Sequence, residues 1–173
     1  MPAFVRAEDL IGPITRVVDL PGGGRELRVE DDVVEFSDDP AVLRKFWGIV
    51  LCLAVRDDAS SIEYHPWRAD GGLAYVVDNV RYVLRHPPPE WAGPIVAAAR
   101  SLVTPAGHGL RARLTRWTGG GIVTGTLAFA VAGWLYEWDV VCWSSGERVG
   151  VEFFRVSPPV ADTTPAPREE SSS

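Results

Sequence analysis

The chain has 173 residues, a net charge of −6, 46% hydrophobic residues and seven tryptophans. This length and composition favour one domain with a large, aromatic core. The acidic balance argues against a general binder of nucleic acids or of anionic membranes.

Residues 1–37 show the least regular pattern. They contain an apolar patch (residues 10–20), a glycine-rich turn and an acidic, strand-like segment (residues 27–36). We interpret them as an N-terminal arm or hairpin. The chain does not begin with the charged and then apolar segments of a signal peptide, and its longest apolar run, residues 127–135, is too short to cross a bilayer. We therefore expect a cytoplasmic protein without membrane insertion.

Residues 38–66 carry the clearest pattern, a capped amphipathic helix followed by a short strand. Asp38 or Asp39 can accept hydrogen bonds from the free amides of the first turn, and Pro40 suits the first helical position. Apolar residues then recur at a spacing of three or four and form one face. They are Val42, Leu43, Phe46, Trp47, Val50, Leu51 and Ala54. The alternation over residues 61–65 predicts a half-buried strand.

The rest of the chain predicts five more strands and a second helix. Residues 73–84 are typical of two strands around Asp78 and Asn79, a turn pair that tolerates positive φ. The second helix is predicted from Glu90 to about Val103. Three strands follow, and their short connections make them antiparallel. They cover residues 122–131, 134–143 and 148–156.

Together these elements predict an α+β fold, a twisted antiparallel sheet with two helices packed on it, in a layer architecture similar to that of PAS domains. The domain is expected to span residues 38–156. The tail at 157–173 is rich in Pro, Ser and Thr and is expected to be disordered.

Three phrases in this domain carry a family resemblance. Residues 59–66 read ASSIEYHP, residues 75–80 read YVVDNV, and residues 146–154 read GERVGVEFF. In order and spacing they resemble the phrases AxxxGASDIHIEP, RYRVDGVL and GERVVLRIL. These belong to the second N-terminal domain of the hexameric ATPases of type II secretion and type IV pilus assembly. The resemblance covers roughly residues 39–156.

The resemblance also makes a missing motif informative. The family's nucleotide-binding core opens with GxxxxGK[ST], in which glycines allow close backbone approach and the lysine meets the phosphates. This chain has one lysine, Lys45, which lies in the first predicted helix. The glycine clusters at 22–24 and 119–121 are not followed by Lys-Ser or Lys-Thr. We therefore expect an accessory domain without the motor, with no enzyme activity and no cofactor.

The basic residues that bind nucleotide in the family are poorly matched. The clamping arginines of the second phrase correspond to Ala74 and Val76, which cannot donate to phosphate. The family's second basic segment, ERRxPQDG, is matched most nearly by Arg111, Arg113 and Arg116, without the Pro-Gln pair. These three arginines are weak candidates for binding a nucleotide or anion, and an exposed basic loop is the preferred interpretation.

Other reactive side chains give no signature. Glu63 and His65 share a face of their predicted strand, and His86 is near enough in sequence to join them, but this spacing does not specify a metal site. We predict no metal and a packing role for this strand.

The hydroxyls of Ser144 and Ser145 lack an identifiable base, and so does the thiol of Cys142. The sequence context predicts that Cys52 and Cys142 are buried and inert.

The resulting prediction is a non-catalytic protein-interaction module that docks on a secretion or pilus ATPase or its assembly platform, a partner implied by the resemblance alone. Trp134 and Trp138 share a strand face and are predicted docking residues if exposed, whereas Trp143 falls on the opposite face. The alternative is a sensor that encloses a small ligand between sheet and helices. Two further hypotheses are an enzyme of another type and a gene remnant without function.

Overall fold

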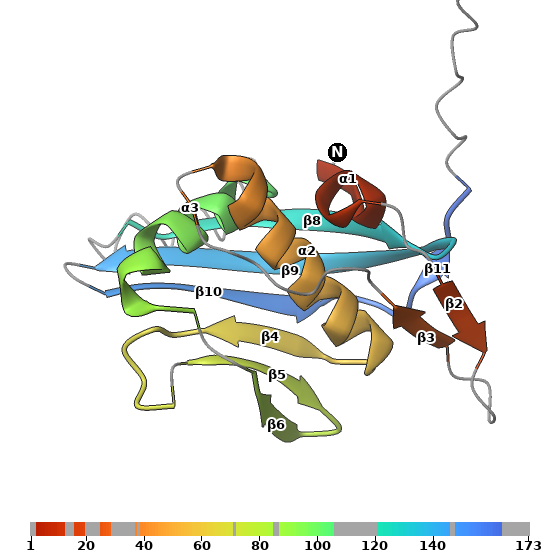
Figure 1. Ribbon diagram of the computed structural model, residues 1–173, viewed down its shortest axis with the longest axis horizontal. Coiled ribbons are helices and arrows are strands. Elements are labelled where there is room, and N and C mark those ends of the chain that lie inside the picture. Colours follow the sequence, from red (N-terminus) through yellow and green to blue (C-terminus); the bar gives the residue numbers. More distant parts are fainter. Residues whose placement is uncertain are drawn as a thin grey trace, which may run out of the picture.

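The computed structural model describes the chain in the following ranges: 3–12, 16–19, 25–28, 37, 39–70, 72–84, 87–105, 121–145 and 148–163. These residues form a large mixed sheet with helices packed on one face (Figure 1). The predicted α+β class is therefore confirmed. No helix in the described ranges is both long enough and apolar enough to cross a bilayer.

The main sheet has nine strands: β1 (Ala3–Arg6), β4 (Ser61–Tyr64), β5 (Leu73–Val77), β6 (Val80–Val83), β7 (Thr104–Pro105), β8 (Val123–Val131), β9 (Trp134–Ser145), β10 (Arg148–Arg155) and β11 (Val160–Ala161). Seven of them follow the order β1-β8-β9-β10-β4-β5-β6, while β7 pairs with β8 and β11 with β9. All pairs in this sheet are antiparallel except β1 with β8. A separate hairpin joins β2 (Arg16–Asp19) to β3 (Arg25–Arg28).

The predicted hairpins form because their turn residues adopt positive φ angles. Asp78 and Asn79 both have positive φ between β5 and β6, as a two-residue hairpin turn requires. Ala132 and Gly133 do the same between β8 and β9. The three strands of the β8-β9-β10 meander were predicted to within two residues at each end, and their pairing confirms the antiparallel arrangement.

The helices are α1 (Ala7–Ile11), α2 (Pro40–Arg56), the short 3₁₀ helix η1 (Pro89–Trp91) and α3 (Ala92–Ser101). Asp39 caps α2, because its Oδ1 accepts a hydrogen bond from the Ala41 amide at 2.9 Å. The apolar face predicted for this helix is buried against the sheet. In Figure 1, α2 and α3 both cross in front of the strands.

Trp47 is the central side chain of the core and is fully buried. Its Nε1 donates to the carbonyl oxygen of Ile95 at 2.8 Å, which ties α2 to α3. Its ring lies 5.0 Å from the ring of Phe153 on β10 and 6.2 Å from that of Tyr64 on β4. One side chain therefore fixes two helices and two neighbouring strands.

Residues 1–37 contain the β2-β3 hairpin, and segments near both ends of the chain also join the main sheet. Residues 3–11 belong to the main domain, because β1 extends the sheet and α1 places Leu10 and Ile11 in the core. At the other end, β11 pairs with β9, and the Asp162 amide donates to the carbonyl oxygen of Gly133 at 2.9 Å. The domain thus continues past residue 156, and residues 164–173 of the predicted tail lie outside the described ranges.

We expect Gly48→Ala to destabilise the protein, although alanine is the better helix former by about 1 kcal/mol. A Cβ at position 48 on α2 would lie 2.7 Å from Ile11 Cγ2 and 2.8 Å from Leu10 Cβ. α1 would have to shift, and overpacking of this kind costs about 1–3 kcal/mol. Thermal unfolding followed by circular dichroism should therefore show a lower Tm.

Gly121→Ala is the matched control, because its Cβ would meet no atom closer than 3.6 Å. Its Tm should equal or exceed that of the parent chain. A Gly48→Ala variant as stable as this control would contradict the packing of α1 on α2.

Candidate functional site

Side chains on β4, β9 and β10 alternate between a helix-covered face and a second face that we call the open face. On these strands or directly after β4, the open-face residues are Ser61, Glu63, His65, Leu135, Glu137, Asp139, Val141, Trp143, Ser145, Arg148, Gly150, Glu152 and Phe154. Their neighbours Tyr64, Trp138 and Phe153 are buried under the helices. All three α-helices of the described ranges lie on the covered side (Figure 1).

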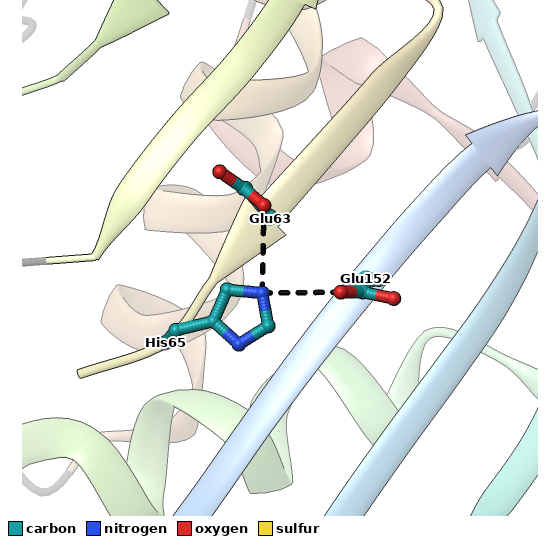
Figure 2. A group of neighbouring side chains, drawn as sticks. All are labelled: Glu63, His65 and Glu152. Carbon is teal, nitrogen blue, oxygen red and sulfur yellow. Dashed lines mark ion pairs between the residues drawn. The ribbon is translucent and has the colours of Figure 1, made fainter. Parts of the chain in front are cut away.

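A histidine and two glutamates meet near the middle of the open face. His65 Nε2 lies 3.1 Å from Glu152 Oε1 and 3.5 Å from Glu63 Oε2. Glu63 on β4 is directly opposite Glu152 on β10 in the strand register. Figure 2 shows the imidazole nitrogen facing both carboxylates. The side chains of His65, Glu63 and Glu152 are 12%, 20% and 31% exposed, so the group is accessible from solvent.

Two tryptophans hold the imidazole ring. The ring centre of His65 lies 5.0 Å from that of Trp67 and 5.1 Å from that of Trp143. Trp143 is paired with Gly150, where a Cβ would lie 2.5 Å from its Cζ2. Glycine at this position therefore lets the indole lie across the strand and reach the histidine.

A tight turn after β4 fixes the backbone of His65. The His65 amide donates to the carbonyl oxygen of Gly72 at 2.8 Å, and the Arg68 amide donates to that of His65 at 2.9 Å. Gly72 has a φ of +70°, and a Cβ there would lie 1.7 Å from the His65 carbonyl oxygen. Only glycine fits this turn, which brings Trp67 beside the imidazole.

Two arginines contact the Glu63 carboxylate oxygen that does not face His65. Arg68 Nη1 lies 3.1 Å from Glu63 Oε1, and Arg81 Nε contacts the same oxygen. Arg81 also pairs with Asp70 at 2.5 Å; this hydrogen bond, together with one from the Gly72 amide, lowers the pKa of Asp70. Hydrogen bonding to Glu63 and then to Asp70 raises the pKa of Arg81, against the opposing effect of burial. Because both guanidinium groups contact Oε1, the Oε2 atom of Glu63 is left facing His65.

The geometry of the cluster suits a cation. One ligand atom from each of Glu63, His65 and Glu152 lies within 4.8 Å of the other two. Imidazole nitrogen and carboxylate oxygen are both common ligands of divalent transition metals. Without a metal, the same three groups form an ion-pair network with Arg68 and Arg81.

A second feature is a cleft of about 210 Å³ between α3 and the sheet. It is lined by Gly93, Val96, Ala97, Arg100, Gly121, Val123, Cys142, Trp143, Ser144 and Val149. Arg100 is its charged lining residue. Pockets for small organic ligands are usually larger, about 300–1,000 Å³. This cleft therefore gives the sensor interpretation little support.

The structure places the predicted site residues in different environments. Trp138 is 0% exposed and faces the helices, so its prediction as a docking residue is wrong; Trp134, on the same face but near the strand end, is half-buried. The alternation of side chains along a strand shows which tryptophans share a face, but it does not show which face the helices cover. Trp143 lies on the face opposite Trp138, as predicted, and this is the open face. The predicted anion-binding residues Arg111, Arg113 and Arg116 and also His86 lie outside the described ranges.

Glu152 is the site residue that sequence reasoning missed. Alternation along β10 places it on one face with Gly150 and Phe154, which the sequence pattern could have indicated. Its meeting with His65 depends on the pairing of β10 with β4. These strands are far apart in sequence, and no short connection predicts that they are neighbours.

Comparisons with known proteins supply no further assignment: no protein-family model matches the chain, and no relative is found among curated protein sequences. The likeness to secretion ATPases therefore depends on the quoted phrases alone.

We expect neither thiol to react in the native protein. Both cysteines are free and buried, and burial raises the pKa of Cys52 to about 12 and that of Cys142 to about 11. At pH 8 the thiolate fraction is then on the order of one in a thousand or less. An aromatic disulfide reagent should label the chain only after denaturation. It should then label both cysteines and release two equivalents of its own thiol per chain. Rapid labelling of Cys142 in the folded protein would contradict this expectation and would make Cys142 a candidate nucleophile.

Proposed function

We propose that the chain is a non-catalytic protein-interaction module and that the open face is its docking surface. The observation that supports this most is that, among the described residues, the α-helices cover one face of the sheet and not the other. Phe154 on β10 is 43% exposed, and Trp67, which contacts Trp143 further along the same face, is 42% exposed. Exposed aromatic side chains within a polar surround are typical of protein interfaces.

Charge indicates the chemistry of the partner. The open face carries the carboxylates of Glu137, Asp139 and Glu152, of which Glu152 also pairs with His65, and the whole chain has a net charge of −6. On this side, Arg68 and Arg81 pair with Glu63 and Asp70, while Arg148 at the start of β10 is exposed. The open face carries more carboxylates than exposed arginines, so a partner with a basic surface is complementary.

The resemblance to the N-terminal domain of secretion and pilus ATPases makes such a motor the proposed partner. In that case the chain acts as an accessory subunit, which binds through surface complementarity and performs no chemistry of its own. The raised pKa values of both buried thiols are consistent with a non-catalytic role. In the part of the chain that the structure describes, the cleft beside α3 is smaller than typical ligand pockets and gives the sensor alternative little support.

We expect Phe154→Ser to reduce capture of the motor ATPase from the native host lysate by about tenfold or more, the effect of a central interface residue. The tagged chain is used as bait, and the recovered ATPase is quantified by mass spectrometry. Val80→Ser is the matched control, because Val80 is 53% exposed but lies on the edge strand β6 outside the open face.

Loss of capture with Phe154→Ser but not with Val80→Ser, at unchanged Tm, supports the open face as the docking surface. Equal capture by both variants would show that docking occurs elsewhere. Recovery of no secretion or pilus ATPase by the parent chain would reject the proposed partner.

A further inference from the structure

We propose that Glu63, His65 and Glu152 form a binding site for a divalent transition-metal ion, with Zn²⁺ as the ion that fits best. The inference is independent of the proposed docking function, because it depends on the geometry of three side chains. One imidazole and two carboxylates form a donor set that suits zinc. Calcium and magnesium prefer oxygen ligands alone and are less suited to a site built around His65.

The distances between the three ligand atoms are close to those in a tetrahedral zinc site. Zinc bonds of about 2.1 Å in a tetrahedron place neighbouring ligand atoms about 3.4 Å apart. His65 Nε2 lies 3.1 Å from Glu152 Oε1 and 3.5 Å from Glu63 Oε2. The two carboxylate oxygens are within 4.8 Å of each other. A small change of side-chain rotamer therefore brings them to the ligand–ligand distance of a tetrahedral zinc site. Three of the four zinc ligands are therefore already assembled.

The charges also favour a cation. Glu63 and Glu152 are directly opposite on antiparallel strands, an arrangement in which like charges repel. Arg68 and Arg81 neutralise Glu63 through Oε1, on the side away from His65. A metal ion between Oε2 of Glu63 and Oε1 of Glu152 removes the remaining repulsion and uses oxygens that these arginines do not contact.

The surroundings hold the ligands in place. Trp67 and Trp143 restrict the imidazole, and the two arginines orient the Glu63 carboxylate, as outer-shell partners do in known metal sites. The same arginines are positive charges near the ion, so we expect weaker affinity than in a closed structural zinc site. The three ligands come from two strands of the open face, which leaves the fourth position for water or a partner's side chain.

The test is isothermal titration of the full chain with Zn²⁺, which should show one site per chain. Glu152→Gln and His65→Gln should each weaken binding about tenfold or more, because each removes a direct ligand. Glu137→Gln is the matched control, since Glu137 is a carboxylate of the same face outside the cluster. A His86→Gln/His108→Gln variant controls for the chain's other two histidines.

Retained binding in both control variants, with loss in Glu152→Gln and His65→Gln at unchanged far-ultraviolet circular dichroism, supports the site. Visible absorption bands of tetrahedral Co²⁺ that disappear in the same two variants support it independently of heat signals. Absence of Zn²⁺ binding by the parent chain, or equal binding by all variants, would overturn the proposal and leave an ion-pair network.

Discussion

The contact of Trp47 with Tyr64 and Phe153 is the constraint on which the rest of the structure depends. It fixes α2 on β4 and β10, and the hydrogen bond to Ile95 adds α3 to the same layer. Because side chains alternate along a strand, directing Tyr64 and Phe153 to the helices directs their neighbours to the other face. The positions of Glu63, His65 and Glu152 therefore follow from the packing of one buried tryptophan.

The two faces of the sheet consequently have different physical roles. The covered face provides the apolar burial that stabilises the fold, with Trp138 and Phe129 among its fully buried side chains. The open face contributes less to burial and can carry charge and exposed aromatic rings. The docking and metal-binding proposals both use this second face, but they depend on different features, the exposed ring of Phe154 and the His65 cluster.

Local patterns predicted most of the elements. The cap and apolar face of α2, the hairpin at Asp78 and the β8-β9-β10 meander all depend on neighbouring residues, and each was predicted from them. Pairings between distant segments were not predictable in this way. They include the parallel addition of β1 to β8 and the contact of β10 with β4 that completes the candidate site. The burial of Trp138 was missed for a related reason, since a period of two assigns residues to faces without saying which face the helices cover.

The central claim is that the open face is accessible in the free protein. Hydroxyl-radical footprinting of the purified chain without any partner, analysed by mass spectrometry at single residues, tests it most directly. The structure predicts rapid oxidation of Trp67 and Phe154, both exposed, and protection of the fully buried Trp47 and Trp138. Protection of Trp67 and Phe154 equal to that of Trp47 would contradict the account, because the face assigned to docking and metal binding would then be covered.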